Sequence, residues 1–413
     1  MKAPKKLLTL TATLVAFLAP QSAHADYSLT TMVTFDGTNG ATPSSGLLVG
    51  KDENFYGTTR EGGTNGIGTI FKMTPSGRLA IVASFNGHNG KWPSGDLIQG
   101  QDGSFYGTAS QGGNRSGDGV VFKLATNGNL TALFSFSDYD DNGGESPDGF
   151  SPYRIVDGND GNFYGTTARN RFGTGAGTVF RITPSGPLTT LATFDSQAEP
   201  AWLVRAVNGR CYFTMAKLGF RLAPLATLES VRKVRSLGTL VQDRQGGFYG
   251  TSFEGGPDGG GLVFRITAGG TTNLVAFDST YSIHGRGPRE LILGRDGSFY
   301  GTTFAGGDTN ETPPVVSKFP TRLPDGSVIY PKVYQARLGP RLDFGTLFRM
   351  TPHGVITTLA VFNRTNGCYP AAGLVEGKDG SFYGTTTEGG VGLNPKGTIF
   401  RLIVPPSPSR TTR

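Results

Sequence analysis

Residues 377–390 read G-K-D-G-S-F-Y-G-T-T-T-E-G-G, and copies of this stretch recur along the chain. The string Phe-Tyr-Gly-Thr has its glycine at Gly57, Gly107, Gly165, Gly250, Gly301 and Gly384, and a degenerate copy puts Phe213 in the same register. The steps between copies are 50, 58, 48, 37, 51 and 83 residues. Recurrence at such periods is the signature of a repeat architecture, so we predict seven repeats, one compressed and one with an insertion.

Each repeat contains four short runs of β-branched and aromatic residues bounded by turn residues, a pattern that predicts β-strands. In the first repeat these runs, named A to D, are residues 46–50, 54–59, 68–73 and 79–85. Asp-Gly pairs such as Asp102-Gly103 join run A to run B, and this pair is a strong hairpin signal because the turn needs φ > 0. Four antiparallel strands per repeat follow.

The phase of the repeat predicts how the repeats are arranged. Residues 29–35 form a spare D run, and the last run, 397–402, is a C run that lacks its D run. Pairing these two runs completes the last repeat, whereas an open solenoid would need caps at both ends. Run B also has an internal glycine, such as Gly57, where we expect an aromatic side chain of the neighbouring sheet to approach closely. We therefore predict an all-β, seven-bladed β-propeller with four antiparallel strands per blade, closed by the N-terminal strand joining the last blade.

The first residues read as a secretory signal. Lys2, Lys5 and Lys6 precede an apolar stretch, residues 7–18, and Ala23-His24-Ala25 has the form of a cleavage site. The apolar stretch is too short to favour a retained membrane helix. We expect residues 1–25 to be a signal peptide, 26–404 the propeller and 405–413 a polar tail. The protein would then be exported, to the periplasm or the extracellular space.

Charge and cysteine content narrow the partners. The formal charge is +7, and removal of the three signal lysines leaves +4, scattered over the chain. Nucleic-acid binding needs a concentrated basic face, so we expect no nucleic-acid partner, and we expect a monomer. Cys211 and Cys368 fall about three blades apart, which is too far for a disulfide.

The longer pattern G-x-D-G-x-F-Y-G-T-T-x-x-G-G, with paired glycines such as Gly62-Gly63 after run B, resembles the GloVer tandem-repeat family of exported bacterial proteins. The resemblance covers nearly the whole of residues 26–413 and is clearest in the first, sixth and seventh repeats. Several members look like surface proteins with a C-terminal sorting anchor, which this chain does not carry. The resemblance implies no reaction and no catalytic residues.

One face of the predicted disc carries the D–A and B–C connections, and the other carries the short A–B and C–D turns. The D–A and B–C loops differ from repeat to repeat, and loops on a rigid scaffold often carry function. Aromatic side chains there can stack on sugars or form a protein hot spot, and loop histidines can hold a metal or move a proton. The alternative is packing under the loops and simple solvation. The candidate ligand-binding residues are Trp92, Tyr139, Tyr281, Tyr369, His88 and His284.

An acidic D–A loop holds the candidate metal site. Asp138, Asp140 and Asn142, followed by Gly143, match the first half of a calcium-binding loop, in which alternate oxygens converge on a hard cation. The twelfth position is Gly149 instead of a bidentate glutamate, so an ordinary acidic turn is the alternative. Beyond calcium we expect no cofactor.

The insertion of the sixth repeat, about residues 308–343, lies in a B–C connection, and loops of this length are often functional or disordered. The leading hypothesis is an exported binding or scaffold module that contacts a glycan or a protein through the D–A/B–C face, without catalytic residues. One alternative is a propeller enzyme acting on polysaccharide, a glycosidase or lyase, which would need two converging carboxyl groups. Another is a purely structural repeat protein.

Overall fold

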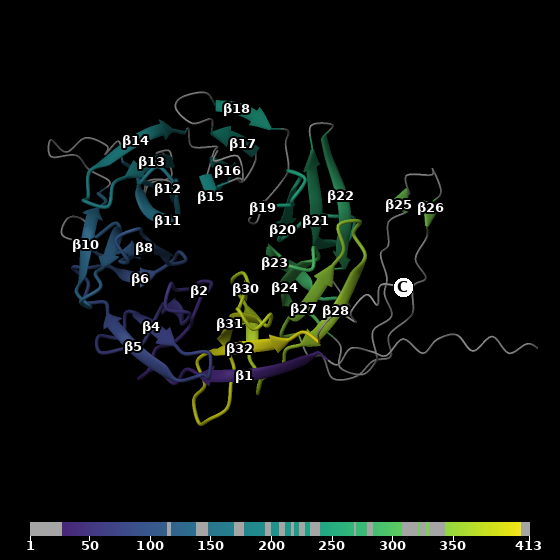
Figure 1. The fold of residues 1–413 in the computed structure, drawn as a ribbon, viewed down its shortest axis with the longest axis horizontal. Helices are drawn as coiled ribbons and strands as arrows, with labels where there is room; N and C mark the ends of the chain where they lie inside the picture. Colours follow the sequence, from purple (N-terminus) through teal and green to yellow (C-terminus); the bar gives the residue numbers. More distant parts are fainter. Residues whose placement is uncertain are drawn as a thin grey trace, which may run out of the picture.

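The computed structural model describes residues 27–113, 117–137, 148–168, 177–194, 200–205, 211–215, 219–222, 228–231, 240–267, 270–278, 284–307, 321–322, 328–329 and 343–405. Within these ranges all regular secondary structure is β-strand, and the sheets are arranged around a common centre (Figure 1). The prediction of an all-β propeller with four-stranded antiparallel blades is confirmed. The described residues contain no helix long and apolar enough to cross a membrane.

The sheets follow one another along the chain, each with run A at the centre and run D at the rim (Figure 1). The first is β2 (Leu48–Val49), β3 (Phe55–Thr59), β4 (Thr69–Met73) and β5 (Leu79–Ser84). Next come β6 (Lys91–Pro93) and β7 (Ile98–Gln99), which share one inner strand position, with β8 (Phe105–Gln111), β9 (Val120–Leu124) and β10 (Leu130–Ser135). They are followed by β11 (Phe150–Asp157), β12 (Phe163–Ala168), β13 (Thr178–Ile182) and β14 (Leu188–Thr193).

The remaining sheets keep the same order. One is β15 (Pro200–Arg205), β16 (Cys211–Met215), β17 (Gly219–Leu222) and β18 (Leu228–Val231), and the next is β19 (Leu240–Gln242), β20 (Phe248–Ser252), β21 (Gly259–Thr267) and β22 (Gly270–Asp278). Then come β23 (Arg286–Leu293), β24 (Phe299–Ala305), β27 (Thr346–Met350) and β28 (Ile356–Val361). A separate hairpin, β25 (Thr321–Arg322) and β26 (Val328–Ile329), belongs to the insertion between β24 and β27.

The last sheet joins the two ends of the described chain. It consists of β29 (Cys368–Pro370), β30 (Val375–Glu376), β31 (Phe382–Glu388), β32 (Thr398–Ile403) and the N-terminal strand β1 (Ser28–Thr34). Strand β1 runs antiparallel to β32, with Leu29 opposite Leu402 and Thr34 opposite Thr398 (Figure 1). The pairing predicted between residues 29–35 and 397–402 is therefore present.

Neighbouring sheets pack through aromatic pairs supplied by the Phe-Tyr-Gly motif. The tyrosine of one sheet packs on the phenylalanine of the next, as Tyr56 does on Phe105 with ring centroids 4.2 Å apart. The same contact joins Tyr106 to Phe163, Tyr249 to Phe299, Tyr300 to Phe382 and Tyr383 to Phe55. Aromatic pairs at such distances add about 0.5–1.5 kcal/mol each beyond the burial of their area. The Phe-Tyr-Gly motif therefore supplies aromatic packing contacts between neighbouring sheets.

The motif glycine has a different partner from the predicted one. Gly57 lies opposite Phe71 in the β3–β4 ladder, and a Cβ added to Gly57 would lie 2.5 Å from Cζ of Phe71. The aromatic ring that covers the glycine thus comes from strand C of the same sheet. The prediction that a neighbouring sheet supplies it was wrong, because cross-strand neighbours are the closest residues in a sheet. The neighbouring sheet instead supplies Phe35, which packs on the outer side of Phe71 at 5.4 Å.

The uniform A–B/C–D turns bind their own side chains. Tyr106 donates a hydrogen bond to Asp102 of the Asp-Gly turn at 2.8 Å, and Lys123 pairs with the same carboxylate at 3.0 Å. Burial raises the pKa of Asp102, but the hydrogen bonds from Lys123 and Tyr106 outweigh burial and hold it at about 2. Tyrosine and a basic residue meet the turn aspartate in the same way at Asp52, Asp296 and Asp379. On this face the tyrosine hydroxyls and the basic side chains bind the aspartates of the A–B turns and so stabilise those turns.

Candidate functional site

Four of the D–A loops enter their sheets through a non-glycine residue with a left-handed backbone, followed by proline. Thr42, Trp92, Ser151 and Tyr369 have φ between 52° and 57°, a region that non-glycine residues rarely occupy. Their backbone N–H groups donate to carbonyl oxygens of the preceding sheet, as Trp92 does to Ile67 at 3.0 Å. We call these four residues the entry positions. The tertiary hydrogen bond fixes their backbone and leaves the side chain free to vary.

The prolines that follow the entry positions explain a second recurrent glycine. Pro93 packs on Gly68 and Pro370 on Gly345, each glycine standing just before strand C of the preceding sheet. A Cβ added to Gly345 would lie 2.8 Å from Cδ of Pro370 and 2.4 Å from a backbone oxygen. Pro43 and Gly397 make the same contact between the first and the last sheets. These contacts fix the position of each D–A loop end against the preceding sheet.

Trp92 is a half-buried aromatic on the D–A/B–C face. The ammonium of Lys91 lies 4.0 Å from its ring centroid, and the guanidinium of Arg60 lies 5.4 Å away. Trp92 therefore lies on the predicted face beside two cations, and its role in ligand binding stays a prediction.

Tyr369 belongs to a larger group, which we call the aromatic cluster: Phe253, Phe304, Tyr369 and Arg289. Tyr369 is stacked on Phe304, with centroids 5.0 Å apart, and Phe253 meets Phe304 edge to face at 5.9 Å. Phe253 and Phe304 stand at the ends of run B in consecutive sheets, and Tyr369 is the entry position of the following one. Phe253 keeps 38% of its surface exposed. The cluster is therefore an aromatic surface that spans three sheets on the D–A/B–C face.

Arg289 packs into the corner formed by the two phenylalanines. Its guanidinium carbon lies 4.7 Å from the ring centroids of both Phe253 and Phe304. Burial lowers the pKa of Arg289, since the rings remove water from the charge. Its Nε is buried and has no hydrogen-bond partner among the described residues, and within the same ranges Arg289 forms no ion pair. The cluster thus holds a cation without a counter-ion in the described part of the chain.

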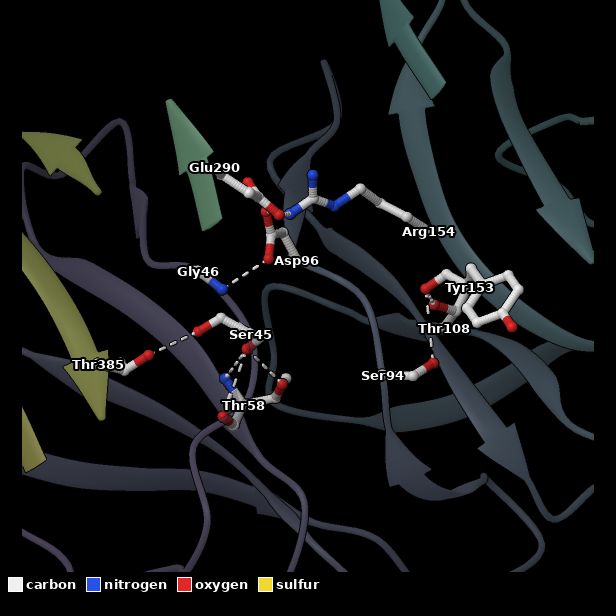
Figure 2. Close-up of polar contacts among 10 residues, drawn as sticks. All are labelled: Ser45, Gly46, Thr58, Ser94, Asp96, Thr108, Tyr153, Arg154, Glu290 and Thr385. Carbon is white, nitrogen blue, oxygen red and sulfur yellow. Dashed lines mark hydrogen bonds and ion pairs between the residues drawn. The ribbon is translucent and has the colours of Figure 1, made fainter. Parts of the chain in front are cut away.

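The centre of the ring contains a charged group, which we call the axial triad: Asp96, Arg154 and Glu290 (Figure 2). Nη2 of Arg154, on β11, donates to Oδ2 of Asp96, which stands just before β7, and to Oε1 of Glu290 on β23 at 2.9 Å. The backbone N–H of Gly46 donates to Oδ1 of Asp96 at 2.6 Å. One arginine therefore ties together the inner edges of three sheets.

Glycines make room for the axial triad. In five of the repeats, the residue that precedes the first leucine or isoleucine of run A is Gly46, Asp96, Arg154, Glu290 or Gly373. A Cβ on Gly46 would lie 3.1 Å from Oδ1 of Asp96, and one on Gly373 would lie 2.7 Å from Oε2 of Glu290. Burial raises the pKa of Glu290, and the nearby positive charge of Arg154 opposes that rise. The triad is a compact group in which two carboxyl groups contact one guanidinium.

The two described loop histidines occupy unlike environments. His88 is exposed, whereas His284 is half-buried, with Nδ1 2.9 Å from Oγ1 of Thr358. Burial lowers the pKa of His284 to about 4. Among the described residues no group of three histidine, cysteine or acidic side chains could hold a metal ion. These two residues therefore form no metal site with their described neighbours.

Several predicted site residues lie outside the described residues. They are Tyr139, Tyr281 and the candidate calcium ligands Asp138, Asp140 and Asn142. The signal peptide, most of the insertion and nearly all of the polar tail also fall there. The last residue of the insertion, Asp343, is described: it pairs with Arg286 at 2.5 Å and accepts the N–H of Gly306 at 2.6 Å. Cys368 is buried and free, and burial raises the pKa of its thiol to about 11.

Residues 20–221 match the family described as the Gloeobacter/Verrucomicrobia repeat. The resemblance read from the Phe-Tyr-Gly-Thr motif is confirmed. A search of curated proteins gives no match.

Solved structures with the same fold are remote in sequence. A streptogramin B lyase is 15% identical with a TM-score of 0.59, covering 92% of this chain and 98% of its own. The virginiamycin B lyase of Staphylococcus aureus, in a complex with quinupristin, is 12% identical with a TM-score of 0.58, covering 92% and 100%. A candidate 6-phosphogluconolactonase from Bacteroides fragilis is 16% identical with a TM-score of 0.50, covering 83% and 87%. At these identities the likeness establishes the β-propeller fold alone.

Sequence reasoning missed the axial triad and most of the aromatic cluster. A comparison of equivalent positions across repeats would have found both. The position before the first leucine or isoleucine of run A is charged in three repeats and uncharged in the other four, and the position after Gly-Thr-Thr or Gly-Thr-Ser is phenylalanine only at Phe253 and Phe304. Departures from a repeat consensus at one register are the signal.

Proposed function

We propose that the chain is an exported, closed seven-bladed β-propeller that acts as a non-enzymatic binding module, holding a glycan on its D–A/B–C face. The pairing of β1 with β32 and the stacking of Tyr383 on Phe55 support a ring that closes through the N-terminal strand. The observation that carries the function is the aromatic cluster. A stacked pair, Phe304 and Tyr369, beside the exposed Phe253 offers flat apolar surface of the kind that sugar rings cover.

The test compares the two faces of the disc. Residues 26–413 are applied to a glycan array, and affinities are then measured by calorimetry for the glycans that bind. The double variant Phe253→Ala/Tyr369→Ala should weaken binding roughly tenfold or more, since hot-spot aromatics each contribute more than about 1 kcal/mol. Val355→Ala is the matched control, because Val355 is an apolar residue, 47% exposed, beside a C–D turn on the opposite face. Unchanged binding by the double variant would contradict the choice of surface.

The insertion is tested separately. Replacing residues 309–341 by a Gly-Gly turn keeps Asp343, which anchors Arg286 and Gly306, and should leave folding intact because loop length costs little stability. Weaker glycan binding by the shortened chain would place the insertion at the ligand. Equal binding would restrict the ligand to the aromatic cluster.

A polysaccharide-cleaving enzyme, a glycosidase or lyase, is the second candidate, and the axial triad is the observation that bears on it. A glycosidase uses two carboxyl groups about 5–10 Å apart, one of them a free acid. Asp96 and Glu290 instead converge on one nitrogen of Arg154, an arrangement that favours a structural plug. Turnover assays on every glycan that binds decide the matter. Product formation that Glu290→Gln abolishes, with binding retained, would establish the enzyme.

A further inference from the structure

The aromatic cluster contains one charged side chain, Arg289, that has no ion-pair partner among the described residues. Arg289 and Glu290 are consecutive on β23, within a register irregularity between Pro288 and Leu291, and they have different partners. The carboxylate of Glu290 forms an ion pair with Arg154 in the axial triad. Arg289 lies against Phe253 and Phe304 and has no hydrogen-bond or ion-pair partner among the described residues.

Other cations of this region differ from Arg289. Arg286 is paired with Asp343 at 2.5 Å, and Arg364 is exposed, with its guanidinium 5.8 Å from the ring of Phe344. Arg289 is partly buried, and its Nε has no hydrogen-bond partner among the described residues. Dry surroundings strengthen any hydrogen bond that the fork makes to an anion, and the planar fork matches a carboxylate with two parallel bonds.

We propose that Arg289 is the recognition residue of a subsite for an acidic sugar: its guanidinium binds the carboxylate of a uronic acid unit, and Phe253 and Tyr369 cover the sugar ring. This assignment rests on the proposed glycan-binding function and narrows its ligand to carboxylate-bearing polysaccharides. The rings supply apolar contact that any sugar would accept. Arg289 supplies the discrimination between charged and neutral sugars.

The test uses two polymers that differ only in this group. Polygalacturonate and its fully methyl-esterified form share one backbone, and the ester removes the negative charge. The chain comprising residues 26–413 should bind polygalacturonate at least tenfold more tightly than the ester, since a hydrogen bond to a charged group contributes about 1.5–3 kcal/mol and 1.4 kcal/mol is tenfold in affinity. Raising the salt concentration should narrow the difference.

Variants assign the discrimination to one residue. Arg289→Gln should reduce polygalacturonate affinity roughly tenfold and leave the ester unchanged, and Arg289→Lys should recover only part of the loss because it keeps the charge without the fork. Arg60→Gln is the matched control: Arg60 is an exposed arginine on the same face, 5.4 Å from the ring of Trp92, and its loss removes the same charge elsewhere. Thermal midpoints of all variants exclude unfolding as the cause.

The outcomes separate the subsite from the function it rests on. Equal affinity for both polymers, or equal loss in Arg60→Gln and Arg289→Gln, would overturn the carboxylate subsite while leaving glycan binding in place. Dextran sulfate that binds as tightly as polygalacturonate, with the same dependence on Arg289, would overturn selectivity for carboxylate over sulfate. Failure of every glycan on the array to bind would overturn both proposals.

Discussion

Tyr383, in the last sheet, stacks on Phe55, in the first, with ring centroids 4.2 Å apart. The geometry equals that between Tyr56 and Phe105, which belong to sheets consecutive in sequence. The contact between the chain ends is thus built like the contacts within the chain. The two contacts should therefore contribute similarly to the free energy of unfolding.

Truncation of either tyrosine should therefore destabilise the protein to a similar extent. Tyr383→Ala and Tyr56→Ala each remove a buried ring and should cost about 3–5 kcal/mol in the free energy of unfolding, measured in urea. Tyr383→Phe keeps the ring and loses only the hydrogen bond to the Asp379 carboxylate, so it should cost about 1.5–3 kcal/mol. A Tyr383→Ala protein as stable as wild type would mean that the two ends contribute no cohesion.

Glycines just before strand C test the contacts with the entry prolines. Gly345→Ala should destabilise the protein severely, because its Cβ would lie 2.4 Å from a backbone oxygen and 2.8 Å from Pro370. Gly297→Ala is the control: its φ of 80° is equally left-handed, but nothing lies within 4 Å of the added Cβ. We expect a loss of about 1 kcal/mol for the control, from backbone strain alone, and at least twice that for Gly345→Ala. Equal losses in thermal melts would show that the contact with Pro370 relaxes freely.

The buried imidazole of His284 predicts a dependence of stability on pH. Its pKa falls to about 4 in the folded protein because burial disfavours the charged form. The unfolded chain takes up this proton near pH 6.5, so the free energy of unfolding should drop by roughly 1–3 kcal/mol as pH falls from 6.5 to 4. His284→Gln should flatten that slope, while His88→Gln controls for loss of an exposed histidine.

Glu290 acts in the opposite direction in part of the same range. Its raised pKa means that the folded state holds a proton that the unfolded state releases, so its contribution is present at low pH and is lost as pH rises through the folded pKa. Denaturant titrations of His284→Gln and Glu290→Gln at each pH separate the two. A wild-type slope in His284→Gln would assign the acid sensitivity to other groups.

Calcium binding remains a prediction from the loop sequence Asp138–Asn142. A ligand that binds only the folded state raises the thermal midpoint, so millimolar calcium should stabilise the protein and Asp140→Ala should remove the effect. Asp148→Asn, ten residues beyond Asp138, tests whether Asp148 stands in for the missing glutamate. A melt unchanged by calcium in the wild type would end the hypothesis.

The fold was predictable because its signals are local. Asp102-Gly103 specifies a hairpin within four residues, and the step from Gly57 to Gly107 reveals the repeat without any tertiary information. The pairing of β1 with β32 followed from the phase of the repeat. The partner of Gly57 was misjudged because a sequence pattern gives the side of a strand on which a residue lies but not which of two nearby aromatic rings covers it.

The candidate site was harder to predict because it depends on distant contacts. Arg154 and Glu290 are 136 residues apart in sequence, and nothing local links them. Phe253 and Phe304 resemble core residues until two sheets place them side by side with Arg289 between them. The position of Tyr369 and Trp92 in D–A loops was readable from the sequence, and their roles in ligand binding stay predictions.

The entry positions have a consequence for protein engineering. Their backbone is clamped by a hydrogen bond from the neighbouring sheet, yet threonine, tryptophan, serine and tyrosine are all accepted at residues 42, 92, 151 and 369. A randomised library restricted to these codons would vary the chemistry of one face while leaving the scaffold's hydrogen bonding untouched. The entry positions thus offer display sites on the D–A/B–C face, from which binders for unrelated targets can be selected.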